Sequence, residues 1–147
     1  MSKENLNDKL EKFRLAFPDD ESCLNLLAVQ KWKDGFVCSK CGNTNYCSGK
    51  LETSRRCTRC KKEESATANT LFHRCKFSLR KAFEIVFLTC HAAAISSYKI
   101  SDMINLRHMT CYSFQKKLSK CLTEGEETGI LKGLISEIER KIEGLGI

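Results

Sequence analysis

Two closely spaced pairs of cysteines constrain this chain more than any other feature of its sequence. Cys38 and Cys41 form one C-x2-C pair, Cys57 and Cys60 form a second, and the 15 residues 42–56 separate them. Four thiolates at this spacing are typical of a structural zinc site, because Zn²⁺ prefers four sulfur ligands in a tetrahedron at about 2.3 Å. We therefore predict one structural zinc ion, held by these four residues in a zinc ribbon of short antiparallel strands.

The residues around the cysteines favour tight turns and short strands. Gly42 directly follows the first pair and supplies the backbone freedom that a knuckle turn needs. Residues 51–56 are predicted to form a strand that returns to the metal, and residues 65–76 an extended connector with one further strand. Three further potential ligands lie outside both pairs and receive no role: Cys47, His73 and Cys75.

The length of 147 residues allows two small modules, one of them closed by metal rather than by a large core. The first residues are charged rather than apolar, and no apolar run approaches the roughly 20 residues of a membrane span. We therefore expect a cytoplasmic protein with no membrane partner. Thiols stay reduced in that compartment, so the ten cysteines do not predict a disulfide framework.

Helices are predicted before the cysteine pairs. Residues 5–17 place apolar side chains at helical spacing, and Pro18 ends this helix. Residues 19–21 are acidic and favour the start of a second helix, whose inward face we expect to include Cys23 and Val29. Three adjacent carboxylates do not converge on one point, so a catalytic acidic cluster is not favoured.

Three helices are predicted after the connector: residues 78–94, a second that starts at Ser96 or Ser97 and ends at 104, and a third that starts at Thr110 or just before it and ends at 122. The first should bury Cys90, and a short break at residues 105–107 separates the other two. Two helices joined by a short turn, with a polar and basic face on the second, favour a helix-turn-helix module. The alternative is a plain three-helix bundle with a solvated polar face.

The net charge of +7 is concentrated in the middle of the chain. Residues 48–80 carry nine basic and three acidic side chains, residues 81–122 carry six basic and two acidic ones, and both ends are net negative. This distribution predicts a polyanionic partner, with a merely solvated surface as the alternative. The predicted DNA contacts lie in the ribbon and on the last of the three helices: Arg55, Arg56, Arg59, Lys61, Lys62, Tyr112, Ser113, Gln115, Lys116, Lys117 and Lys120.

Two stretches carry a family resemblance. One is residues 65–79, and the other is a run of tryptophan, Gly-Phe and cysteine positions: Trp32, Gly35, Phe36, Cys38, Cys41, Cys57 and Cys60. Together they resemble the N-terminal region of bacterial zinc-ribbon insertion-sequence transposases of the DDE class, over residues 12–122. Such transposases have glycine where this chain has Asn69, a mild departure because asparagine tolerates a left-handed backbone.

The resemblance implies the DNA-binding front end of a transposase. Members of that family continue into an RNase H-like domain whose Asp, Asp and Glu bind divalent metals for strand transfer. The 25 residues after Leu122 have clustered acids that cannot form such a set, so we expect no enzyme activity. Expected partners are double-stranded DNA and either a second copy or a transposase catalytic subunit. The alternative function is a protein-interaction or transcription-regulatory module that uses the ribbon and the C-terminal helix.

The expected fold class is small α+β, divided into five segments. These are N-terminal helices at 1–33, a zinc ribbon at 34–65, a connector at 66–77, a helix-turn-helix module at 78–122, and an acidic loop with an amphipathic helix at 123–147. The last helix carries an a/d stripe of about two heptads: Leu131, Ile135, Ile138, Ile142 and Leu145. We expect it to pack back onto the preceding module rather than to self-associate.

Overall fold

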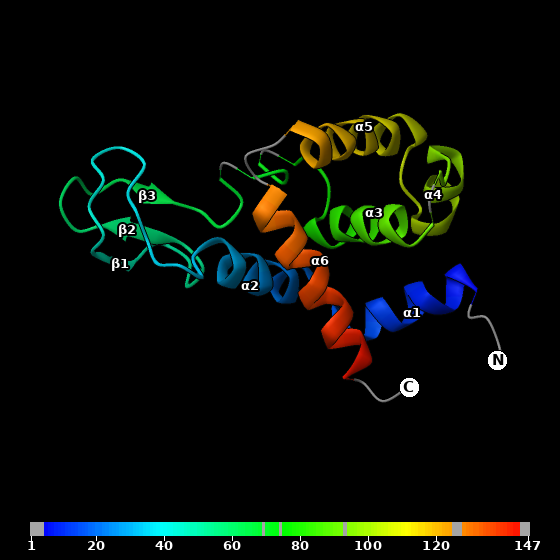
Figure 1. The fold of residues 1–147 in the computed structure, drawn as a ribbon, viewed down its shortest axis with the longest axis horizontal. Helices are drawn as coiled ribbons and strands as arrows, with labels where there is room; N and C mark the ends of the chain where they lie inside the picture. Colours follow the sequence, from blue (N-terminus) through cyan, green and yellow to red (C-terminus); the bar gives the residue numbers. More distant parts are fainter. Residues whose placement is uncertain (1–4, 69, 74, 93, 125–127, 145–147) are drawn as a thin grey trace.

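The computed structural model describes residues 5–68, 70–73, 75–92, 94–124 and 128–144. Within them it has the small α+β architecture predicted from the sequence, with the strands at one end of the molecule and most helices at the other (Figure 1). The elements are α1 (Leu6–Ala16), α2 (Asp20–Lys31), β1 (Tyr46–Ser48), β2 (Arg55–Cys57), β3 (Glu63–Glu64), α3 (Leu79–His91), α4 (Ser97–Ile104), α5 (His108–Glu124) and α6 (Thr128–Glu143). None of these helices combines the length and apolarity needed to cross a bilayer.

Side-chain caps set the start of four helices. In each case a side-chain oxygen accepts a hydrogen bond from the backbone N–H three residues further on, which satisfies a donor that the helix itself leaves unpaired. The caps, with donor–acceptor distances of 2.8 to 3.3 Å, are Asn5 for α1, Asp19 for α2, Ser78 for α3 and Ser96 for α4. The predicted starts of these helices are therefore confirmed, and α5 begins at His108, among the residues just before Thr110 that the sequence also allows.

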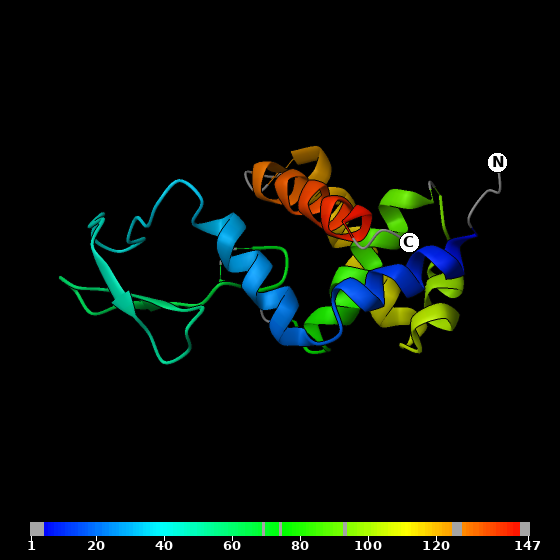
Figure 2. The same ribbon diagram turned by 90° about the horizontal axis from the view of Figure 1, so that it is seen from below.

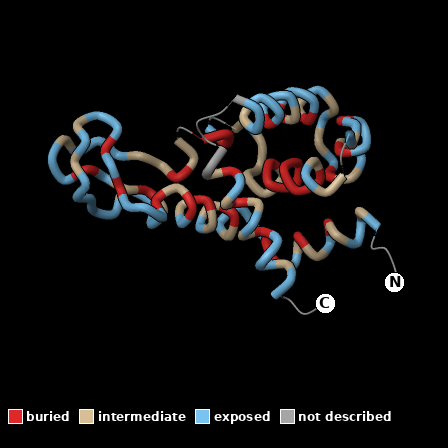
Figure 3. Tube along the Cα trace, in the orientation of Figure 1, coloured by how far each residue is buried: buried red, intermediate tan, exposed pale blue. Residues whose placement is uncertain are grey.

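Helix α3 is the centre of the helical body, and residues 82–88 are buried without interruption (Figure 3). Helix α1 packs against it through aromatic rings, with centroid distances of 5.1 Å for Phe13–Phe87 and 6.3 Å for Phe17–Phe83. Helices α2, α4 and α5 also contact α3. The predicted inward position of Cys23 is confirmed, but those of Val29 and Cys90 are wrong, because both side chains face solvent.

Helix α6 crosses the body and contacts α1, α2 and α5, so the C-terminal helix does pack back onto the rest of the chain. Leu131 and Ile138 are buried as predicted, and Leu134, which the heptad stripe left out, is fully buried as well. A helix enclosed by three neighbours buries a wider face than two heptad positions supply. The predicted stripe position Leu145 lies outside the described residues.

The three strands form an antiparallel sheet in the order β1-β2-β3. The sheet projects beyond the end of α2, away from the other helices (Figure 2). The strand predicted at 51–56 is displaced, since β2 starts at Arg55 and residues 51–53 form a turn. The strand predicted within 65–76 is wrong, because the described residues there form turns, in which the Ser65 and Thr70 hydroxyl groups bond to nearby backbone.

Candidate metal centre

Each cysteine pair lies on a tight turn of the same construction. In the first turn the N–H of Gly42 donates to the carbonyl of Cys38 at 2.9 Å, and in the second the N–H of Lys61 donates to the carbonyl of Cys57 at 3.0 Å. Both donor residues have a left-handed backbone, with φ of 75° at Gly42 and 66° at Lys61. The prediction for Gly42 is confirmed, and the second turn places a lysine where glycine is usually favoured.

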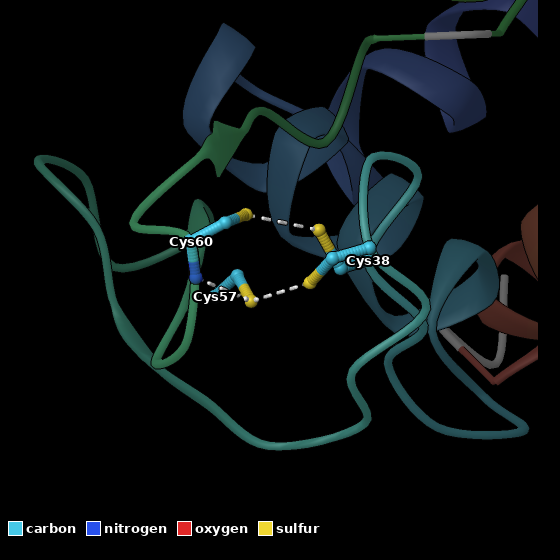
Figure 4. Close-up of side chains that lie close together, drawn as sticks. Cys38, Cys57 and Cys60 are labelled. Atoms are coloured by element: carbon cyan, nitrogen blue, oxygen red, sulfur yellow. Dashed lines mark hydrogen bonds between the residues drawn. The ribbon is translucent and has the colours of Figure 1, made fainter.

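The two turns bring all four cysteine sulfurs together. The Sγ–Sγ distance is 3.5 Å both between Cys38 and Cys60 and between Cys41 and Cys57, and all four sulfurs lie within 4.8 Å of one another (Figure 4). A tetrahedral zinc ion with bonds of about 2.3 Å separates its sulfur ligands by about 3.8 Å. The spacing therefore matches a four-sulfur zinc shell closely.

Hydrogen-bond donors surround the sulfur of Cys57. Burial disfavours a thiolate there, yet the pKa of Cys57 is lowered to about 5 by donors that point at its sulfur. These donors are the backbone N–H of Cys60 at 3.5 Å, the side-chain amide of Asn43 at 3.4 Å and the backbone N–H of Arg59 at 3.4 Å. The thiolate is the form that binds metal, so the turn prepares its own ligand.

The environment of Cys41 shows why a cation belongs in the cluster. The backbone N–H of Asn43 lowers the pKa of Cys41, but burial and the three neighbouring cysteine sulfurs raise it to about 11. Four thiolates this close repel one another, and a divalent ion between them removes that repulsion. The cluster therefore fits one structural zinc ion, and four sulfurs leave no coordination position for water or substrate.

A buried lysine at the end of α2 joins the helix to the sheet. The side chain of Lys31 is only 8% exposed, and its Nζ lies 3.0 Å from a carboxylate oxygen of Glu64 in β3. The same Nζ donates to the carbonyls of Ser65, at 2.9 Å, and Ala68. This single side chain thus holds the end of α2, the last strand and the turn that follows it.

A stacked arginine also joins the end of α2 to the sheet. The guanidinium of Arg55 in β2 lies 4.7 Å from the ring centre of Trp32, directly after α2, and 4.1 Å from that of Tyr46 in β1. Cation–π contacts of this kind are favourable at such distances. Helix α2 and the three strands are therefore one structural unit.

Residues 18–63 match the family model described as the transposase zinc-ribbon domain. The match spans α2, both cysteine pairs and the start of β3, so it covers nearly all of the unit that Lys31 and Arg55 hold together. For this part of the chain, the resemblance to transposases is confirmed. The contacts of Lys31 and Trp32 with the sheet cross the predicted boundary at residue 33, and the five-segment division stays a prediction. No curated protein and no solved structure matches the chain.

The predicted DNA contacts in the zinc ribbon fall into two groups. Arg55 and Arg56 are engaged within the sheet, the first between the two rings and the second at 2.9 Å from a carboxylate oxygen of Glu63. The other three lie on and beside the second cysteine turn: Arg59, Lys61 and Lys62. All three are exposed, as Arg56 is, and the ammonium groups of the two lysines donate hydrogen bonds within the ribbon, at 2.9 and 3.0 Å. The structure therefore gathers the latter on one turn, and their contact with DNA stays a prediction.

The predicted contacts on α5 lie mostly on its exposed face. The exposed members are Tyr112, Ser113, Lys116, Lys117 and Lys120. Gln115 is half-buried, and its amide donates to the carbonyl of Ile95 at 2.9 Å, which ties α5 to the turn before α4. The opposite side of α5 buries the expected apolar residues: Cys111, Phe114 and Leu118.

Sequence reasoning missed two residues at this centre. Asn43 received no role from the sequence, although its side-chain amide, two residues after Cys41, reaches the sulfur of Cys57. Lys31 carried no signal, because its partners lie 33 and more residues further along the chain. Of the unassigned residues, Cys47 is exposed on β1 outside the sulfur cluster.

Proposed function

We propose that this chain is a transposase-related protein that binds double-stranded DNA, such as transposon ends, and has no strand-transfer activity of its own. The observation that carries the proposal is the exposed basic face of α5, in a chain whose residues 18–63 match a transposase zinc ribbon. Lysines on one helix face neutralise phosphates, while neighbouring polar side chains reach base edges. The zinc ion then has a structural role.

Helices α4 and α5 act in this proposal as a helix-turn-helix. The turn between them contains Asn105 in a left-handed conformation with φ of 55°, and the N–H of Leu106 donates to the carbonyl of Ser101 at 3.3 Å. Helix α5 contacts α3, α4 and α6 and leaves the face with its lysines exposed to solvent. A recognition helix needs this arrangement to enter a major groove.

The acidic residues support a binding role over catalysis. Two-metal strand transfer needs several carboxylates that converge on the same ions. Among the described residues, the four cysteines form the one group of three or more Cys, His, Asp or Glu side chains near enough to share a metal ion. Their closed shell favours structure over chemistry.

The test is a gel-shift titration against the terminal inverted repeats of a neighbouring element, with a scrambled duplex as the reference. We expect tighter binding to the repeats and a steep loss of affinity with salt. Replacing Lys116, Lys117 and Lys120 together by alanine should abolish the shift, while the exposed control pair Lys33→Ala and Lys132→Ala should leave it unchanged. Equal binding to both duplexes with no salt dependence would sink the proposal.

A protein-interaction module is the second candidate. Large apolar side chains are exposed on α2 and the ribbon, namely Val29, Val37 and Leu51. A partner protein such as a full transposase would cover them. Partner pull-down by the triple-lysine variant in nuclease-treated extract, without any gel shift from the wild-type protein, would favour this role over DNA binding.

A further inference from the structure

A groove runs beside α5 and shares only Ser113 and Lys117 with the predicted DNA contacts. It measures about 560 Å³ and lies between residues 71–73 and 75–77 on one side and the first half of α5 on the other. Apolar side chains line part of it, with the rings of Phe77 and Phe114 in edge-to-face contact at 5.5 Å. This α5 groove is therefore a defined concave surface with an apolar floor.

The remaining lining of the α5 groove is polar and basic. Its basic members are His73, Lys76, Arg107 and Lys117, all exposed. No aspartate or glutamate is among the described residues that line it. A surface with several cations and no carboxylate attracts an anionic ligand.

The α5 groove continues along the helix. A second hollow of about 590 Å³ shares Ser113 and Lys117 with it and adds Lys116 and Lys120, again with no described carboxylate. From Met109 to Thr123 the two cover about 21 Å of helix, at about 1.5 Å per residue. One strand of B-DNA has one phosphate per about 3.4 Å of duplex axis, and its winding backbone follows a longer path, so this length holds fewer than about six phosphates.

We propose that the α5 groove holds the sugar–phosphate backbone of one DNA strand, and that Lys76 and Arg107 bind its phosphates. This inference rests on the proposed DNA-binding function and adds to it a second wall of the DNA site, supplied by the segment before α3. The basic rim matches the phosphates, and the apolar floor matches the faces of the deoxyribose rings. In this arrangement α5 lies in the major groove, and the backbone of one strand lies along the side of α5 that borders the groove. The phosphate contacts then fix the position and orientation of α5 on the duplex.

The first test compares salt dependence. The variant Lys76→Ala/Arg107→Ala removes two exposed cations, and Lys33→Ala/Lys132→Ala is the control that removes two exposed cations elsewhere. The slope of log affinity against log salt changes by about 0.9 for each phosphate contact, so we expect the groove variant to lose about 1.8 from it on both repeat and scrambled duplexes. The control should keep the wild-type slope, and circular dichroism should show that both variants stay folded.

The second test uses a native thiol. Cys75 lines the α5 groove, whereas Cys90 is exposed on α3 and serves as an internal reference. Duplex DNA should slow N-ethylmaleimide labelling of Cys75 severalfold and leave Cys90 unchanged, as read by peptide mass spectrometry. Cys75 labelling at the same rate with and without bound DNA would overturn the groove assignment.

The outcomes separate this inference from the proposed function. If the triple-lysine variant of α5 loses binding but the groove variant keeps the control's slope, the groove assignment falls and DNA binding stands. If the wild-type protein binds no duplex, both fall. An acidic peptide could also be tested as a competitor of duplex DNA at equal total charge. If the peptide competes as effectively as unlabelled duplex DNA, the assignment of the groove to a DNA backbone is overturned.

Discussion

The buried carboxylate of Glu84 should be the most sensitive single point of the helical body. Glu84 lies in the middle of α3 and is 0% exposed. Its oxygens accept hydrogen bonds from Arg14 of α1 at 3.2 and 3.4 Å, and Arg80 of α3 lies 3.4 Å away. Arg14 also donates to the carbonyl of Met103 at 3.3 Å, so the cluster joins α1, α3 and α4.

We expect Glu84→Gln to lower the free energy of unfolding by about 2 kcal/mol. Removing one partner of a buried ion pair usually costs about 3–5 kcal/mol, because the other charge is left unpaired. The side chains of Arg14 and Arg80 remain 39% and 32% exposed, so both can regain water, and the amide still accepts one hydrogen bond. Both features reduce the loss.

The assay is urea unfolding followed by circular dichroism at saturating zinc, with the slope of free energy against urea unchanged. Glu137→Gln is the matched control, because Glu137 pairs at 3.1 Å with Arg140, whose side chain is 76% exposed. That surface pair should contribute less than about 0.5 kcal/mol. If Glu84→Gln costs no more than the control, the carboxylate does not hold these helices together.

Three further predictions concern the metal and one turn. Chelation should unfold residues 36–64 and leave the helical circular dichroism largely in place, since structural zinc binding is coupled to folding; amide exchange unchanged in the ribbon would contradict this. Asn43→Ala should weaken zinc about 10-fold or more in competition with a chromophoric chelator, because one donor to Cys57 is lost, whereas the exposed Asn45→Ala should not. Asn105→Ala should cost about 1 kcal/mol in urea unfolding and Asn105→Gly close to nothing, because φ is 55° there; equal effects would rule out backbone strain as the cause.

Local chemistry made much of this structure predictable. The cysteine spacing gave the metal cluster, and capping residues such as Asp19 and Ser78 gave helix starts, because these signals act over three or four residues. The turns among the described residues of 65–76 were missed because small β-tolerant residues favour a strand. Hydrogen bonds from side-chain hydroxyl groups and from the distant Lys31 hold the described residues in turns instead. Glu84 was missed for the same reason, since its partner Arg14 is 70 residues away.

The spacing of the two basic surfaces was beyond sequence reasoning altogether. Neither α5 nor the ribbon carries any local mark of the other, and their relation depends on how α2 meets α3 and α6. At that crossing a Cβ on Gly133 would lie 2.6 Å from the side-chain oxygen of Gln30, so the side chain of Gln30 in α2 packs directly onto Gly133 in α6. Such a contact emerges only from the packed whole.

Helix α2 belongs to two assemblies at once, and this has a consequence for any DNA ligand. Lys31, its last residue, pairs with Glu64 of the ribbon, while the rest of the helix packs against α3 and α6. Because α2 contacts both parts, the cysteine turn with Arg59 and the exposed face of α5 are held at a fixed separation and orientation. If DNA contacts both surfaces, as the proposed function requires, a duplex has to present its two contact patches at that separation and on matching sides of the double helix. Inserting half a helical turn of DNA between the two contact patches should therefore prevent the protein from making both contacts at once. Inserting a whole turn returns the patches to the same side of the duplex but leaves them farther apart.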